Sequence, residues 1–128
     1  MAPARLQIGS LFAGYGVAGL FWGAFAASTP VFQAQSGLGP GGFGLALGAM
    51  SLAALPVMQI FGRMLHRIER WAIPLAMTVF ALGCGMLALA TALPMLIAAL
   101  LVLGGASGAL DIALNNRTAR IEDTTGAR

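Results

Sequence analysis

The residues best suited to chemistry in this chain lie in its last long apolar stretch. Small and polar residues recur there at intervals of three and four, so they share one face of a helix: Gly104, Ser107, Gly108, Asp111 and Asn115. The opposite face carries apolar residues such as Leu103 and Leu110. Asp111 is the only acid within an apolar segment. An ionisable side chain in such a place is a functional candidate, because its burial is costly.

The depth of Asp111 leaves three interpretations open. It follows Met95 by sixteen residues, or about 24 Å of helix, in an apolar layer about 30 Å thick. It therefore lies near the second boundary, within reach of arginines that flank the apolar segments: Arg63, Arg67, Arg70 and Arg117. The carboxylate could form an ion pair that clamps helix ends, act as a protonatable transport site, or lie at a solvated helix end.

Other motifs give little support for catalysis. Residues 14–19 and 37–42 both match the dinucleotide-binding pattern Gly-x-Gly-x-x-Gly, but that pattern needs an acid about 20 residues later. The first acid is Glu69. His66 and Cys84 are the only residues of their types, so no metal-ligand spacing exists. We expect no enzyme, no metal and no cofactor.

Composition indicates an integral membrane protein. The chain has 128 residues, of which 59% are hydrophobic and 9% charged, whereas soluble domains carry about 25% charged residues. The seven basic residues are all arginine and fall at the ends of apolar segments. They form no continuous basic face, which argues against a nucleic-acid partner and for the lipid bilayer as the partner.

The apolar segments predict an all-α polytopic membrane protein with four transmembrane helices, at residues 8–29, 43–61, 72–90 and 95–115. Between and after them we expect an uncharged loop at 30–42, a charged loop at 62–71, a short turn at 91–94 and a tail at 116–128. A cleaved signal peptide is the alternative for the first segment, although its apolar run exceeds the usual length of about 7–15 residues.

Charge predicts the orientation. Arg5, the loop 62–71 and the tail 116–128 hold all the basic residues, and the loops between the other helix ends hold no charge. By the positive-inside rule both termini are cytoplasmic. We expect a multi-pass protein of the bacterial inner membrane.

Two strings resemble motifs of the major facilitator superfamily. Residues 62–71 read Gly-Arg-Met-Leu-His-Arg-Ile-Glu-Arg-Trp, similar to the cytoplasmic pattern Gly-x-x-x-Asp-Arg-x-Gly-Arg-Arg of that family. Gly62, Arg67 and Arg70 match, and His66 replaces the Asp. Residues 104–115 resemble the Gly-rich Asp-x-x-x-Asn fourth helix of a bacterial branch that includes rhizopine-transport-like proteins.

The resemblance implies the first part of the N-terminal six-helix half of a secondary transporter for a small solute, with proton coupling as one option. The chain would then be a fragment, and the remaining transporter helices would be its partners. The resemblance places the cytoplasmic gate at Gly62, Arg63, Arg67, Arg70 and Asp111. Candidate cavity-lining residues are Tyr15, Trp22, Ser107 and Asn115, with packing or lipid contact as the alternative for the two aromatic residues.

Two other functions remain open. A small multidrug-type four-span exporter suits the length, but it needs a membrane-embedded Glu in its first helix, and no acid precedes Glu69. A non-transporting four-helix membrane subunit would pack against partners through its glycine faces.

Overall fold

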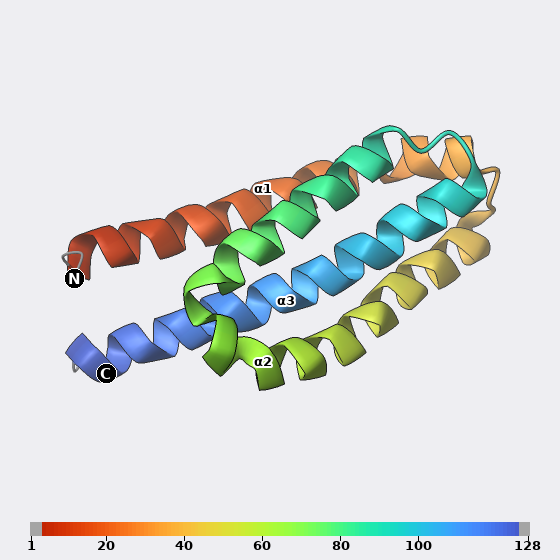
Figure 1. Cartoon of the computed structure of the whole chain (residues 1–128). Coiled ribbons are helices and arrows are strands. Elements are labelled where there is room, and N and C mark those ends of the chain that lie inside the picture. Colours follow the sequence, from red (N-terminus) through yellow and green to blue (C-terminus); the bar gives the residue numbers. More distant parts are fainter. Residues whose placement is uncertain (1–3, 126–128) are drawn as a thin grey trace. The chain divides into compact units, whose positions relative to one another are not determined.

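Three long helices make up the part of the chain that the computed structural model describes, namely the backbone of residues 4–125 and the side chains of residues 8–123. They are α1 (Ala4–Ser36), α2 (Pro40–Ala88) and α3 (Leu93–Thr125), shown in Figure 1. Each contains a stretch long and apolar enough to cross a membrane. The all-helical part of the predicted fold class is confirmed.

The predicted count of four helices is wrong, because the expected loop at residues 62–71 is helical and lies inside α2. Charge predicts on which side of a membrane a segment lies, but it does not determine the backbone conformation. No glycine or proline stands between Gly62 and Pro74, and Arg, Met, Leu and Glu all favour helix. Figure 1 shows the ribbon reversing direction in this green section through a short transverse run of helical turns. We call residues 62–71 the bend, residues 40–61 the first arm and residues 72–88 the second arm.

The helices also extend beyond their predicted ends. α1 continues to Ser36, into the expected loop 30–42, and stops where Gly37 adopts a left-handed φ of 67°. Glycine tolerates that conformation and commonly ends helices. The expected tail 116–128 is helical as far as Thr125, and Arg128 lies outside the described residues. A short turn separates α2 from α3 as predicted, but it comprises residues 89–92, two positions earlier than the expected 91–94.

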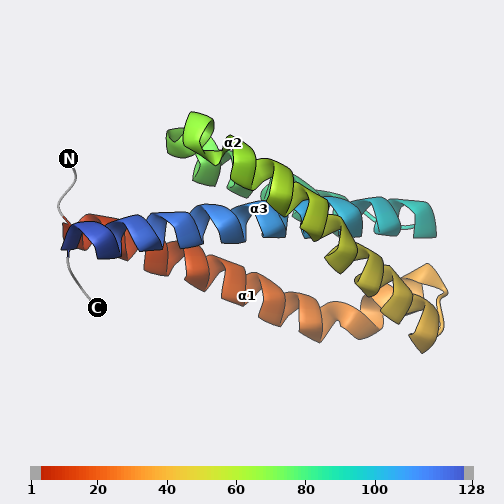
Figure 2. The ribbon, with the colours of Figure 1, turned by 90° about the horizontal axis from the view of Figure 1, so that it is seen from below.

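The chain divides into two compact units, which we describe separately. The terminal unit comprises Met1–Thr29 and Leu114–Arg128. In it the first part of α1 and the last part of α3 run antiparallel, side by side in Figures 1 and 2. A methyl group on Gly14 would lie 3.1 Å from Cδ2 of Leu114. The Leu114 side chain therefore packs against the backbone of α1 at this glycine.

The hairpin unit, Pro30–Ala113, is built around α3. One side of α3 contacts the first arm, where Gly104 meets the backbone of Met50. Another side contacts the second arm, where an added Cβ on Gly83 would lie 2.9 Å from Cγ of Leu103. Leu103 is 0% exposed. Figure 2 shows the first arm crossing α3 obliquely, with α3 lying between the two arms of α2.

Candidate functional site

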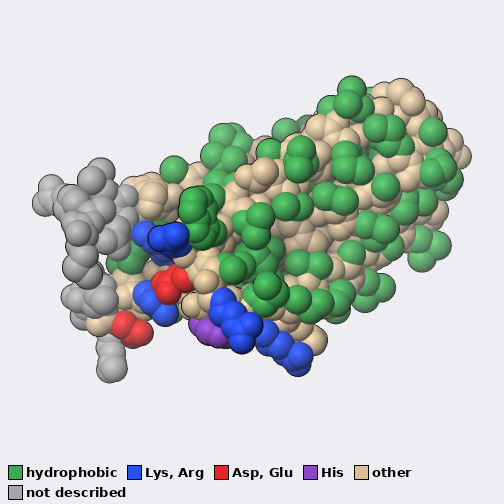
Figure 3. Space-filling model, viewed as in Figure 1, with side chains coloured by type: hydrophobic (Ala, Val, Ile, Leu, Met, Phe, Trp, Pro, Cys, Tyr) green, Lys and Arg blue, Asp and Glu red, His purple; other side chains and the backbone are tan. Residues whose placement is uncertain are grey.

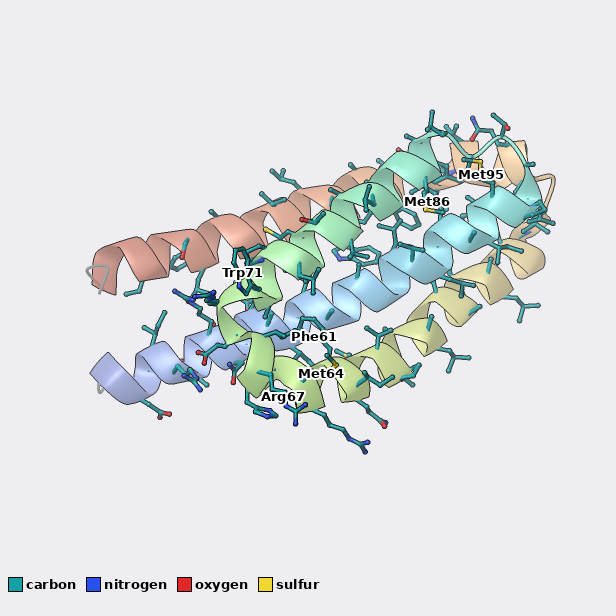
Figure 4. The ribbon with its side chains drawn as sticks, viewed as in Figure 1. Phe61, Met64, Arg67, Trp71, Met86 and Met95 are labelled. Atoms are coloured by element: carbon teal, nitrogen blue, oxygen red, sulfur yellow. The ribbon has the colours of Figure 1, made fainter. Side chains whose placement is uncertain are left out.

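The bend presents its arginines on one side and its apolar residues on the other. Arg63, Arg67 and Arg70 are all exposed, and their spacing of four and three residues places them on one helical face. Figure 4 shows Arg67 directed away from the other helices. In Figure 3 the blue and purple side chains of this section gather at the bend, and the visible surface of both arms beyond it is uncharged.

The opposite face of the bend is a small core. The buried residues Leu65, Ala72 and Ala113 pack there together with partly buried apolar neighbours, which are Phe61, Ile68, Ile73 and Ile112. Gly62 is exposed, and a Cβ at this position would lie 3.7 Å from Cδ1 of Ile112, an ordinary contact. Within the hairpin unit, close packing therefore does not require glycine at position 62.

Arg70 makes a specific contact that the sequence did not reveal. Its guanidinium carbon lies 5.4 Å from the ring centroid of Trp71, within the range of a cation–π interaction. Trp71 is 60% exposed. Adjacent residues on a helix do not normally face each other, so spacing gave no reason to pair them.

Asp111 lies on the surface of α3, in a helix that carries no other charge between Leu93 and Asn116. Its side chain is exposed, and no ion pair or hydrogen bond to it occurs among the described residues. The expected pairing with Arg63, Arg67 or Arg70 is therefore not formed in this structure. Ser107, one turn earlier, is partly buried. The pair offers a carboxylate and a hydroxyl on one helical face.

Two glycines on this face of α3 lie close to the first arm. A Cβ on Gly108 would lie 2.8 Å from Cγ of Met58 and 3.1 Å from the carbonyl oxygen of Ala54, and one on Gly104 would overlap the Met50 backbone. Backbones can approach this closely only at small residues. These glycines thus fix the distance between α3 and the first arm.

Tyr15 and Asn115 form a direct contact within the terminal unit. The Tyr15 hydroxyl donates a hydrogen bond to Oδ1 of Asn115, with 2.8 Å between the oxygens. Both residues were predicted to line a cavity, but sequence spacing alone could not pair two residues one hundred positions apart. Tyr15 also borders a groove of about 300 Å³ between the two helices. Its other lining residues are Ile8, Leu11, Phe12, Thr118, Ile121 and Glu122.

Trp22 belongs to an aromatic cluster on α1. Its ring stands edge-on to Phe25 with centroids 5.8 Å apart, and to Phe21 at 5.4 Å. Trp22 is 39% exposed and does not line the groove beside Tyr15. In the terminal unit it packs along its own helix.

A second groove, of about 370 Å³, runs along the hairpin unit between the two arms of α2 and α3. Its walls are entirely apolar and include Val57 and Phe61 from the first arm, Leu75 and Val79 from the second, and Leu101 and Val102 from α3. The sequence did not reveal this groove, because it depends on how the arms fold back on each other.

Within the described residues, no group of three or more His, Cys, Asp or Glu side chains is arranged to hold a metal ion. Comparison of the chain with known protein families, with curated proteins and with solved structures gives no match.

Proposed function

We propose that the chain is embedded in a lipid bilayer and crosses it four times, with both ends on the cytoplasmic side. α1 and α3 each have the length for one crossing. α2, at 49 residues, would be about 74 Å long if straight. This exceeds twice the hydrocarbon thickness of about 30 Å, and its reversal at the bend brings the second arm back across.

The outer surface of the helices supports this environment. Large apolar side chains are exposed along α1 and both arms, among them Phe12 and Leu20, each 77% exposed, and Leu45, 78% exposed. Exposed apolar area of this extent marks a lipid or protein interface. The exposed arginines of the bend then lie at the phospholipid headgroups of the cytoplasmic leaflet.

Cysteine labelling tests the orientation. In a Cys84→Ser background, Arg67→Cys should react with a membrane-impermeant maleimide only in inside-out vesicles or permeabilised cells. Thr91→Cys, in the turn between α2 and α3, should react in intact cells. The opposite pattern would refute the proposed orientation.

We further propose that these helices belong to a secondary transporter of a small solute, of the major facilitator type. The observation that carries this proposal is the exposed carboxylate of Asp111 on an otherwise uncharged stretch of α3. A carboxylate at membrane depth is costly unless something compensates its charge. A proton, a cationic group of the solute, or an arginine that moves during the transport cycle would each compensate it.

The transport proposal is tested with the protein in inside-out vesicles that carry a pH gradient, reported by a fluorescent acridine dye. Pools of amino acids, sugars and polyols are added, and a solute that collapses the gradient identifies coupled transport. Asp111→Asn should abolish the response. Asp123→Asn, which removes an equal charge from the exposed end of α3, should keep it. A response that survives Asp111→Asn would refute the role of this carboxylate.

A non-transporting membrane subunit is the second candidate, and two open glycine faces favour it. An added Cβ would meet no atom within 4 Å at Gly44 and Gly48 of the first arm, nor at Gly16, Gly19 and Gly23 of α1. Such faces allow another helix to approach closely. Replacing Gly44 and Gly48 by leucine should release a partner protein if the chain is such a subunit, while Asp111→Asn should not.

A further inference from the structure

We propose that the hairpin unit binds one anionic phospholipid, with an acyl chain in the apolar groove between the arms of α2 and the phosphate at Arg70 in the bend. This inference rests on the proposed membrane embedding, and it is independent of transport.

The groove has the size and lining that an acyl chain requires. Its volume of about 370 Å³ falls within the range of small-molecule pockets, about 300–1,000 Å³. None of its lining residues carries a charge, a hydroxyl or an amide side chain. A polar solute would lose its hydrogen bonds to water there without gaining others, which is unfavourable. A hydrocarbon chain would lose nothing.

The lining residues of the groove that lie nearest to the bend in sequence are Phe61 and Leu75. Leu75 and Val79 line it on the second arm, and Trp71 lies one turn before Leu75 on the same helical face. Phe61 lines it on the first arm, at the start of the bend. Figure 4 shows Phe61 and Trp71 on either side of the bend, where the two arms meet.

The charge at that end fits a phosphate. The Arg70 guanidinium carbon lies 5.4 Å from the centroid of the exposed Trp71 ring. A guanidinium stacked on a ring still offers its N–H groups at the edge, and these bind phosphate oxygens in pairs. Tryptophan itself favours the headgroup level of a bilayer. Along the chain, the cation Arg70, the aromatic ring of Trp71 and the groove residue Leu75 therefore follow one another in the order of a phospholipid's phosphate, interface and acyl chain.

The test uses the fluorescence of Trp71 in a Trp22→Phe background, which leaves Trp71 as the only tryptophan. The whole chain is reconstituted into bilayers that contain either phosphatidylcholine or phosphatidylglycerol with brominated acyl chains, which quench tryptophan on contact. At equal mole fractions, brominated phosphatidylglycerol should quench Trp71 more strongly than brominated phosphatidylcholine does. The difference should correspond to a local concentration of the anionic lipid about fivefold or more higher, which is the enrichment expected from one arginine.

Two pairs of variants separate the parts of the site. Arg70→Gln should reduce this preference about fivefold, whereas Arg117→Gln, an equal loss of charge outside the hairpin unit, should leave it unchanged. Val79→Phe fills the groove and should lower quenching by the anionic lipid. Leu82→Phe, on the same arm but outside the groove, should not.

Equal quenching of the original protein by both lipids would overturn the proposal, as would a preference that survives Arg70→Gln or Val79→Phe. Vesicle flotation separates these results from a failure of membrane embedding. A chain that floats with vesicles while neither lipid quenches Trp71 has its groove covered by protein, and the lipid site is then excluded. A chain that does not float refutes the proposed embedding itself.

Discussion

Replacing Gly104 by alanine should separate α3 from the first arm of α2. The added methyl group would overlap the carbonyl oxygen of Met50 and lie 2.9 Å from the Met50 carbonyl carbon. Ordinary carbon–carbon contacts lie at about 3.5–4.0 Å. Because the obstacle is backbone, no side-chain rotation relieves it, and the helices must move apart.

The expected loss of stability follows from the separation of the two helices. Separating the helices also loosens the contacts at Gly105 with Val57 and at Gly108 with Met58, since all three glycines face the first arm. Overpacking of this kind costs about 3 kcal/mol at the upper end of its usual range. Alanine regains about 1 kcal/mol through its better helix propensity. We therefore expect a net destabilisation of about 2 kcal/mol.

Gly48→Ala is the matched control. It adds the same methyl group to the neighbouring arm, where no atom lies within 4 Å, so it should be neutral or stabilising by up to about 1 kcal/mol. Unfolding of the purified protein by dodecyl sulfate in mixed micelles, followed by circular dichroism, measures both variants. If Gly104→Ala unfolds no more readily than Gly48→Ala, the close approach of α3 to the first arm is refuted.

Two further sets of substitutions test the terminal unit and the bend. The Tyr15→Phe and Asn115→Ala variants, with their double mutant, should show a coupling energy of about 1 kcal/mol, typical of a hydrogen bond between membrane helices; additive effects would exclude the bond. Leu65→Ala should destabilise the protein by about 2 kcal/mol, because Leu65 is 8% exposed in the core of the bend, whereas Met64→Ala, at 47% exposed, should change stability by less than about 0.5 kcal/mol. Equal effects of the two would contradict the assignment of these faces.

The sequence predicted the helical class and the positions of the apolar segments because hydropathy acts over twenty or more residues at once. It failed at the bend. Arg63, Arg67 and Arg70 indicated that the segment leaves the apolar layer. Their spacing fits one face of a helix, but the same spacing can occur in a loop, so it did not decide the backbone conformation. Leu65 and Ala72 lie on the opposite face and are buried together with Ala113, and this contact joins segments distant in sequence.

The sequence indicated candidate residues for the site, but it did not predict the contacts between them. Tyr15 and Asn115 were both predicted to line a cavity, yet their hydrogen bond depends on how α1 and α3 align. The Arg–Asp pairing expected for Asp111 is absent from the described part of the chain. Its exposed position on α3 keeps the carboxylate available to a group outside the chain.

Some glycines of the hairpin unit contact a neighbouring helix, and others face open space. Gly104 and Gly108 contact the first arm, whereas Gly44 and Gly48 contact nothing in the hairpin unit. Glycine in a helix interior costs about 1 kcal/mol relative to alanine, and the contacts at Gly104 and Gly108 offset that cost within the chain. At Gly44 and Gly48 no contact offsets it, which is the arrangement expected where a further helix packs. The face of the first arm that carries Gly44 and Gly48 is therefore open within the hairpin unit, and small residues there would let another helix approach its backbone closely.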